Sequence, residues 1–368
     1  MMTREELIGM LGTPFSDSET DRELFAEAVR VRNRAVGDKV YLRGLIELSN
    51  RCRKNCLYCG IRSGNSAAER YTLTDGQVLA AAEYAWRSGY GSVVIQAGER
   101  TDRAFTERIE RLVRQIKTLS DGELGITLSL GEQERETYRR WFGAGAHRYL
   151  LRIEASSPEL YARLHPADHR YEKRLECLGW LKEEGYQVGT GVMIGLPYQS
   201  VTDLADDLLF FRNLDIDMCG MGPYIEFPGT PLAEAPCAFA RDERLRLALR
   251  MIALLRLLMP DINIASTTAL HALHPQGREL GIAAGANVMM PNLTPAVVRA
   301  NYKLYDNKPL QDMDLRGFNV ALDSGWGDSR HFSVRTAGAP VSALREKWER
   351  VRRALRRLIH TIRAMIAR

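Results

Sequence analysis

Residues 49–63, SNRCRKNCLYCGIRS, hold three of the six cysteines of this chain. Cys52, Cys56 and Cys59 follow one another as Cys-x3-Cys-x2-Cys, so a single loop can turn all three toward one centre. Thiolates are soft donors that select iron–sulfur clusters, zinc or Cu(I). On a cube of four irons, three protein ligands would leave one iron open to a substrate or a cofactor. Four basic residues surround the cysteines and would offset the negative charge of a thiolate-bound cluster: Arg51, Arg53, Lys54 and Arg62.

Two other interpretations of this loop stay open. A structural zinc site takes four ligands, usually as two separated pairs, and this chain has no second C-x2-C pair. The remaining cysteines, Cys177, Cys219 and Cys237, are isolated in the sequence. A three-coordinate zinc with a distant histidine or aspartate would still fit, as would a loop whose cysteines are buried or paired as disulfides.

Composition excludes several classes of protein. The net charge of +5 is local, because residues 344–368 contain nine Lys or Arg and two Glu. The rest of the chain is close to neutral, which does not support general nucleic-acid binding. The first residues, MMTREELIGML, lack the apolar core of a signal peptide, and no run of 18 apolar residues predicts a membrane span. Six unevenly spread cysteines do not make a disulfide framework. We therefore expect a protein of the reducing cytoplasm.

Short β-like runs alternate with helical segments after residue 37. The eight expected strands cover residues 40–48, 92–96, 125–130, 148–154, 187–196, 218–225, 262–268 and 287–291. The expected helices between and after them cover residues 74–88, 105–119, 132–142, 158–164, 171–184, 201–213, 241–258, 276–284 and 295–305. Consecutive β-then-α units favour parallel strands with crossover helices, and eight such units close a barrel. The sequence thus predicts an α/β fold, a (β/α)8 TIM barrel. An open doubly wound sheet is the alternative, but no G-x-G-x-x-G follows the first strand.

Three parts of the chain are expected. Residues 1–37 read as an N-terminal helical segment, and residues 38–308 form the barrel. Residues 309–368 form a C-terminal extension with an irregular start and an amphipathic basic helix over 341–368. We expect this helix to dock on the barrel with its arginines in solvent, while a membrane-surface or partner-docking helix is the weaker alternative.

In an α/β barrel the active site lies at the C-terminal ends of the strands. The candidates at these ends are Gln96, Gly98, Glu99, Thr127, Ser129, Glu132, Arg152, Glu154, Thr190, Met193, Met218, Met221, Ser266, Thr267, Thr268 and Asn292, with Arg174 on a following helix. Arg152 and Glu154 are two residues apart and point to one face, where a charge pair needs partners to be buried. A salt bridge on the barrel rim, hydroxyls bonded to backbone and packing methionines are the structural alternatives. The seven histidines show no metal-type spacing.

The cysteine motif, with the aromatic Tyr58 directly before the third cysteine, is that of the radical S-adenosylmethionine (radical-SAM) enzymes. Within that superfamily the chain resembles the HydE family of [FeFe]-hydrogenase maturases. The matching stretches run in order along the barrel: RYTLT (70–74), VIQAGE (94–99), TLSLGE (127–132), HRYLLRIE (147–154), MIGLP (193–197), GMGPYI (220–225), ASTTAL (265–270) and GANVMMPNLTP (285–295).

The resemblance implies two cofactors, a [4Fe–4S] cluster and S-adenosylmethionine. Cys52, Cys56 and Cys59 would hold the cluster, whose open iron binds S-adenosylmethionine and whose electron cleaves it to a 5′-deoxyadenosyl radical. The residues implied around S-adenosylmethionine are Gly98 and Glu99 at the methionine amine, Ser129, Glu154 and Arg174 at the methionine and ribose, and Tyr58, Met193 and Met218 near the adenosyl group. The residues implied to line the interior cavity are Gln96, Arg152, Thr267, Thr268 and Tyr302.

The family further implies that the radical acts on a small iron complex carrying cysteine, CO and cyanide, during assembly of the hydrogenase diiron subcluster. Other hydrogenase maturases and an electron donor are the expected partners. No cysteine follows Cys237, where many members carry three more, so a single cluster is expected. Ala97 stands where the family often has serine. The alternatives are an amino-acid mutase of the methylornithine synthase type, a biotin synthase relative, and a non-enzymatic iron–sulfur or zinc-binding protein.

Overall fold

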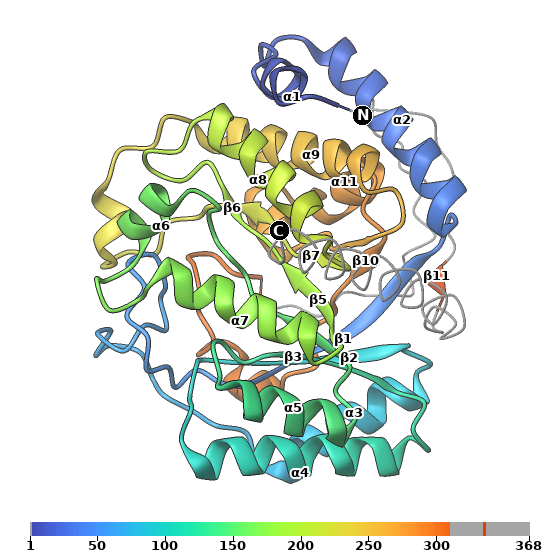
Figure 1. Ribbon diagram of the computed structural model, residues 1–368, viewed down its shortest axis with the longest axis vertical. Coiled ribbons are helices and arrows are strands. Elements are labelled where there is room, and N and C mark those ends of the chain that lie inside the picture. Colours follow the sequence, from blue (N-terminus) through green and yellow to red (C-terminus); the bar gives the residue numbers. More distant parts are fainter. Residues whose placement is uncertain (1, 310–333, 336–368) are drawn as a thin grey trace, which may run out of the picture. The chain divides into compact units, whose positions relative to one another are not determined.

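Parallel strands form a barrel in the computed structural model of the chain, which describes residues 2–309 and the backbone of 334–335 (Figure 1). The eight neighbours around the sheet are β10 (Val288–Met289), β1 (Val40–Ser49), β2 (Ser92–Ala97), β3 (Gly125–Ser129), β4 (Arg148–Leu150), β5 (Gln187–Thr190), β7 (Met218–Cys219) and β9 (Asn263–Ile264). A short strand, β11 (Val334–Arg335), pairs with β1 outside this path. Backbone hydrogen bonds from Asn287 N to Ile264 O (3.0 Å) and from Ser266 N to Val288 O (2.9 Å) join β9 to β10. The predicted barrel is confirmed.

Two of the predicted strands are each broken in two. β6 (Met193–Ile194) continues the line of β5, β8 (Gly222–Pro223) continues that of β7, and these two short strands pair with each other. The breaks fall at glycines, because the two backbones approach too closely for side chains. A Cβ on Gly191 would lie 2.2 Å from the Gly220 carbonyl oxygen.

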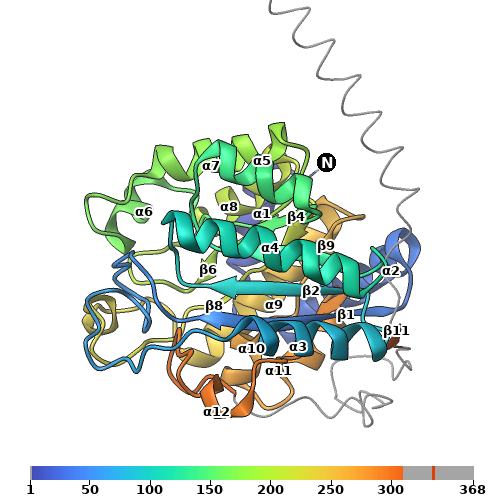
Figure 2. The same ribbon diagram turned by 90° about the horizontal axis from the view of Figure 1, so that it is seen from below.

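Helices cover the outside of the strands, and Figure 2 shows α3 and α4 alongside β1 and β2. Their bounds are α3 (Asp75–Arg87), α4 (Arg103–Leu119), α5 (Arg135–Ala144), α6 (Pro158–Leu164), α7 (Tyr171–Glu183), α8 (Val201–Leu214), α9 (Arg241–Leu258), α10 (Thr268–Leu273), α11 (Gly277–Ala283) and α12 (Ala296–Arg299), with a 3-10 turn, η1 (Pro231–Glu234). Thr74 and Ser200 begin α3 and α8 with capping boxes. Within the described part of the chain, no helix has the length and apolarity that crossing a bilayer requires.

Several expected boundaries were wrong. The fourth strand, predicted over 148–154, ends at Leu150. The seventh ends at Ile264, and α10 begins at Thr268 inside the predicted 262–268 strand. The helix predicted for 295–305 is only the short α12, since the chain turns after Ala300 and places Tyr302 in the core. The helix predicted over 341–368 lies outside the described residues, and the three-part division of the chain stays a prediction.

The register of the first strands decides which side chains face the barrel interior. Glu47, Gln96 and Ser129 are level with one another on β1, β2 and β3. Their neighbours Ile46, Ile95 and Leu128 are fully buried in the apolar core shared with the surrounding helices. Because successive side chains of a strand alternate in direction, the polar set points inward.

The N-terminal segment folds as α1 (Arg4–Leu11) and α2 (Ser18–Val36), which pack on α8 and α9 (Figure 1). Asp21 of α2 is 1% exposed, and its Oδ1 accepts a hydrogen bond from Arg250 Nε at 2.6 Å. Arg246 of α9 also pairs with this carboxylate. The Arg250 guanidinium further donates to the carbonyls of Leu11 (3.1 Å), the last residue of α1, and Thr13 (2.7 Å), just beyond it. One buried ion pair thus connects both helices to the barrel.

Replacing Asp21 with Asn should therefore lower the midpoint of thermal unfolding, because the guanidinium of Arg250 would stay buried without a counter-charge. We expect the free energy of unfolding to fall by about 3–5 kcal/mol. The matched control is Asp206→Asn, whose partner is Arg4 in an exposed pair with 42% and 43% side-chain exposure. In this control the free energy of unfolding should fall by no more than about 1 kcal/mol. Equal midpoints for the two variants would contradict this account of how the segment is held.

Candidate active site

The cysteine loop leaves β1 at Ser49 and lies against the turn that follows β2. Gly98 N donates to Ser49 O at 2.9 Å, and Arg53 N donates to Glu99 O at 2.9 Å. A Cβ on Gly98 would lie 2.5 Å from the carbonyl oxygen of Arg51, so only glycine permits this contact. The backbone of Gly98 is therefore the surface on which the loop rests.

Side chains outside the cysteine motif hold the far side of the loop. The Arg70 guanidinium donates to the carbonyl oxygens of Asn50, Ile61 and Arg62 at 2.7 Å and to that of Asn65 at 3.0 Å. These carbonyls lie before and after the three cysteines in the sequence, so one guanidinium connects the two ends of the loop by hydrogen bonds. Arg70 was not among the predicted site residues, although it belongs to a stretch that resembles the family.

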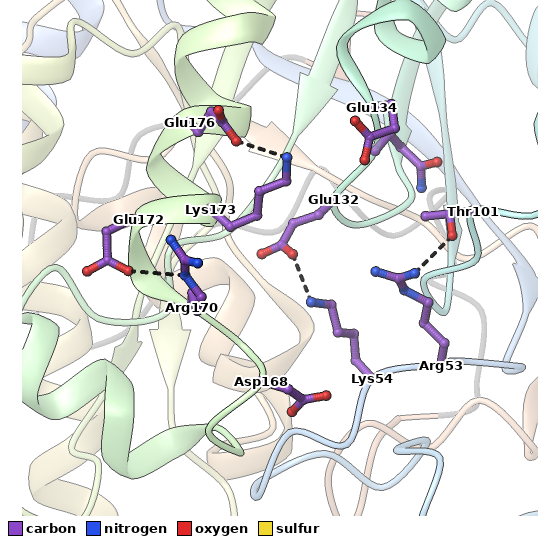
Figure 3. Close-up of a pocket in the computed structure, with 11 residues that line it drawn as sticks. Arg53, Lys54, Thr101, Glu132, Glu134, Asp168, Arg170, Glu172, Lys173 and Glu176 are labelled. Atoms are coloured by element: carbon purple, nitrogen blue, oxygen red, sulfur yellow. Dashed lines mark hydrogen bonds and ion pairs between the residues drawn. The ribbon is translucent and has the colours of Figure 1, made fainter.

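A buried ion-pair network joins the loop to the barrel. Lys54 Nζ lies 2.8 Å from Glu132 Oε2, and Arg174 Nε lies 2.7 Å from Glu132 Oε1. Figure 3 shows Lys54 extending toward Glu132. Burial raises the pKa of Glu132, but the charges and hydrogen bonds of Arg174 and Lys54 outweigh it and lower this pKa to about 2. The Glu132 carboxyl, which is 4% exposed, is thus charged at neutral pH.

Glu99 belongs to the same network. Its Oε2 accepts a hydrogen bond from the Glu132 backbone N–H at 2.8 Å, and its Oε1 lies 3.0 Å from Arg53 Nε and 3.7 Å from Lys54 Nζ. Burial raises the pKa of this carboxyl, against the attraction of Lys54. The structure therefore places the side chain of Glu99 among cations of the loop.

Residues implied for the cofactor site and the interior cavity lie at neighbouring strand ends and on α7. Ser129 is the last residue of β3 and is half-buried. Arg152 Nη2 lies 2.9 Å from Glu154 Oε2 and donates to the Val192 carbonyl at 2.9 Å, while Arg174 donates to the carbonyl of Arg152. Glu154 has a φ of +67°, in the left-handed region that non-glycine residues rarely adopt. Such strain is typical of functional sites.

The remaining cofactor residues divide into two groups. Tyr58 and Met193 pack against a small apolar cluster that includes Ala155, Leu160 and Leu196. Met218, in contrast, is the first residue of β7, and its sulfur accepts a hydrogen bond from Arg43 of β1 inside the barrel. Met218 was expected among the residues at the C-terminal strand ends, and this was wrong, because β7 begins at Met218 as the predicted 218–225 strand does.

The residues expected in the interior are brought together only in part. Thr268 Oγ1 lies 2.7 Å from the Tyr305 hydroxyl, and Thr267 Oγ1 donates to the Met221 carbonyl at 3.3 Å. Gln96 faces inward at the level of Glu47, as its register shows. Tyr302 is 1% exposed and lies under the Lys308 ammonium, which is 4.8 Å from the ring centre.

Sequence reasoning missed the buried pair that organises this region. Lys308 Nζ contacts Glu47 Oε1 and donates to the Tyr302 carbonyl at 2.8 Å. Asn292 Nδ2 donates to the other oxygen of Glu47 at 3.1 Å. Glu47 reads in the sequence as one residue of a strand, and its partner lies 261 residues further on, so no local pattern marks the pair.

Two histidines contact the cysteine loop, although their spacing in the sequence did not predict a role in the site. His165 and His169 are 3% and 6% exposed. His165 Nδ1 lies 2.8 Å from the Tyr161 carbonyl oxygen, and its Nε2 lies 3.4 Å from the Tyr58 hydroxyl. His169 Nδ1 lies 3.8 Å from Cys56 Sγ. Both rings therefore contact the motif from a segment about 110 residues away.

A pocket of about 680 Å³ opens beside the loop (Figure 3). Its lining is charged with both signs: Arg53, Lys54, Thr101, Glu132, Gln133, Glu134, Asp168, Arg170, Glu172, Lys173 and Glu176. Lys173 pairs with Glu176 at 2.9 Å, while Arg53 donates to Thr101 Oγ1 at 3.0 Å. Lys54 and Glu132 form part of the wall, so the buried network adjoins this pocket.

The three cysteines fit an iron–sulfur cluster as ligands. They are free thiols, partly exposed on one loop, and the Glu99 backbone N–H donates to Cys52 Sγ at 3.3 Å. Burial raises the pKa of each thiol, to about 12 for Cys56, so a bound metal is what would stabilise the thiolates. Among the described residues, no three His, Cys, Asp or Glu side chains are grouped to hold a single ion, whereas a cluster engages each thiolate through a different iron.

Comparison with known proteins agrees with this chemistry. Residues 46–211 match the family model of the radical SAM superfamily. Over 306 residues the chain is 44% identical to the [FeFe] hydrogenase maturase subunit HydE of Thermotoga maritima. The match covers 83% of this chain and 84% of that protein. The chain belongs to the HydE family of radical-SAM enzymes. As a radical-SAM enzyme it uses a [4Fe–4S] cluster and S-adenosylmethionine.

More distant relatives share the same architecture as this HydE-family chain. It is 27% identical to the 3-methylornithine synthase of Methanosarcina barkeri over 79% of this chain and 80% of that protein. The crystal structure of methylornithine synthase superposes with a TM-score of 0.68 at 24% identity, covering 79% of this chain and 82% of the other. This second likeness shows the fold.

Replacing Gly98 with Ala should displace the cysteine loop, because the added Cβ would lie 2.7 Å from Cys52 Cβ as well as against Arg51. Overpacking of this kind costs about 1–3 kcal/mol. We expect the variant to bind less iron and sulfide per chain after anaerobic reconstitution. Gly179→Ala is the matched control, since nothing lies within 4 Å of a Cβ there. Full iron content in Gly98→Ala would show that the loop does not depend on this contact.

Proposed function

We propose that this chain acts in the maturation of [FeFe] hydrogenase, on a small iron complex carrying cysteine, CO and cyanide. The observation that carries the proposal is the 44% identity to HydE of Thermotoga maritima over most of both chains. Other hydrogenase maturases and a protein electron donor are its proposed partners. The inward-facing polar residues of the barrel supply a site in which a small, charged complex could be held.

Cys52, Cys56 and Cys59 are the proposed ligands of the cluster. When bound there, the cluster and S-adenosylmethionine together supply a 5′-deoxyadenosyl radical by one-electron cleavage of the sulfonium. The loop contributes the three thiolates, and Lys54 brings a positive charge close to them. Three thiolates can face one cluster only if the loop keeps a fixed shape. The contacts of Gly98 and Arg70 hold the loop in that shape.

Arg174, Glu154 and Ser129 are the proposed contacts of the methionine and ribose parts. A guanidinium and a carboxylate on adjoining segments suit the carboxylate and ammonium of an amino acid. Gly98 and Glu99 are the proposed contacts of the methionine amine. The Glu99 carboxylate also accepts from Glu132 N and pairs with Arg53, so we propose that it helps to hold the loop as well.

Arg152, Gln96, Thr267, Thr268 and Tyr302 are proposed to bind the iron complex. Arg152 is the cation of this set, and cyanide ligands give such a complex negative charge that it can neutralise. Its side chain is 30% exposed and its partner Glu154 is 12% exposed, so the guanidinium has room for a second anion. Surrounding strands would keep water from the radical, which prevents side reactions.

The relationship to 3-methylornithine synthase favours a second candidate, a radical-SAM amino-acid mutase. The two candidates differ in substrate. A mutase of that type would turn over lysine, whereas the maturase would alter the CO and cyanide stretching bands of an iron–cysteine complex.

The test uses anaerobically reconstituted protein with dithionite, S-adenosylmethionine and the iron–cysteine–CO/CN complex. We expect 5′-deoxyadenosine, a change in the infrared CO and CN bands, and restored hydrogenase activity in an extract lacking its own HydE-family maturase. Cys56→Ala should lose cluster and all three signals, whereas Cys237→Ala, at a partly exposed cysteine outside the motif, should keep them. Lysine turnover without any effect on the iron complex would reject the maturase in favour of the mutase.

A further inference from the structure

His169 approaches the middle cysteine of the motif from outside the loop. Its Nδ1 lies 3.8 Å from Cys56 Sγ, a separation at which an N–H can donate to sulfur. The ring is 6% exposed, so solvent does not compete strongly for this nitrogen. The Tyr58 side chain also interacts with the Cys56 sulfur, and the contact to Cys52 comes from the backbone of Glu99.

The surroundings of the ring favour a proton on Nδ1. A turn closed by His169 N donating to Pro166 O at 2.9 Å fixes the backbone. The other ring nitrogen, Nε2, lies 3.8 Å from Asp168 Oδ1, which is beyond hydrogen-bond distance, and the Asp168 side chain is 83% exposed. A metal-bound thiolate can only accept a hydrogen bond, and a neutral imidazole has one N–H to give. The sulfur therefore selects the tautomer that carries its proton on Nδ1.

We propose that His169 donates a hydrogen bond from Nδ1 to the sulfur of Cys56 and so raises the reduction potential of the cluster. This inference rests on the proposed role of Cys56 as a ligand. Hydrogen bonds to cluster sulfurs are one of the means by which a protein sets this potential. The reduced cluster carries one more negative charge than the oxidised one, so a donor to its sulfur stabilises the reduced form more. His169 is thus a positioning and tuning residue, outside the set of metal ligands.

The experiment compares His169→Phe with His165→Phe. Phenylalanine keeps a planar ring but has no N–H. His165 lies in the same cluster of rings, where its two nitrogens face the Tyr58 hydroxyl and the Tyr161 carbonyl. Both variants are reconstituted anaerobically, assayed for iron and sulfide, and titrated without S-adenosylmethionine while EPR follows the reduced cluster. Iron and sulfide are measured first, so a Cys56 that is not a ligand shows up separately, as an unchanged cluster content in Cys56→Ala.

We expect His169→Phe to hold its cluster and to shift the potential downward. At a fixed solution potential the ratio of reduced to oxidised cluster should fall by about three- to tenfold, where tenfold equals about 59 mV for one electron. His165→Phe should shift it much less. An unchanged potential in His169→Phe, or an equal shift in His165→Phe, would overturn the proposal.

A second measurement decides the case in which His169→Phe fails to hold a cluster. The His165→Phe protein is labelled with ¹⁵N-histidine, and pulsed EPR of its reduced cluster is recorded. A ¹⁵N coupling from the remaining nearby histidine supports the hydrogen bond. The absence of any such coupling contradicts it.

Discussion

The carboxylate of Glu132, held between the ammonium of Lys54 and the guanidinium of Arg174, is the contact on which the rest of the site depends. It joins three parts of the chain that are far apart in sequence: the cysteine loop, the segment after β3, and α7. All three charges are buried, and removing one partner from such a set costs about 3–5 kcal/mol because the others stay uncompensated. Glu99 adds a second carboxylate to the same cations. Neither acid needs to touch a ligand to determine where the thiolates lie.

The network also extends to the strained strand end opposite the loop. Arg174 donates to the carbonyl of Arg152, two residues before the left-handed Glu154. A non-glycine residue in that region costs about 1–3 kcal/mol and persists where neighbours hold it. Here Glu154 N donates to Gly191 O at 3.0 Å and its carbonyl accepts from Met193 N at 3.0 Å, so both sides of the residue are bonded to the next strand. The cysteine loop and the opposite wall of the site are therefore fixed by one connected set of contacts.

Much of the fold could be predicted from the sequence because its signals are local. Eight β-then-α units are visible as alternating patterns, and Cys52, Cys56 and Cys59 lie within one loop. The missed features depend on contacts between distant segments. The breaks between β5 and β6 and between β7 and β8 arise where Gly191 meets Gly220. Polar residues at strand ends were found as a class, but periodicity could not show that Glu99 faces cations. The ligand roles assigned to the site residues remain predictions.

The histidines and the Glu47–Lys308 pair also could not be predicted from the sequence, because their partners are distant in the chain. Histidines are recognised in a sequence when they repeat at a metal-type spacing, and His169 is a single histidine that contacts a cysteine 113 residues away. Lys308 lies where the barrel pattern ends, and nothing nearby in the sequence indicates that its ammonium is buried. In both cases a residue in a segment without recognisable periodicity contacts a residue of a segment that the sequence does identify, the cysteine loop or the first strand.

Amide hydrogen exchange of residues 50–63 in the cluster-free protein tests most directly whether the Glu132 network holds the cysteine loop. Glu132→Gln is compared with Glu134→Gln, which lines the same pocket but makes no capping hydrogen bond at the start of α5. Loss of the ion pairs should speed exchange in the loop by more than about tenfold in Glu132→Gln and leave it unchanged in Glu134→Gln. Equal protection of the loop in both variants would contradict the account.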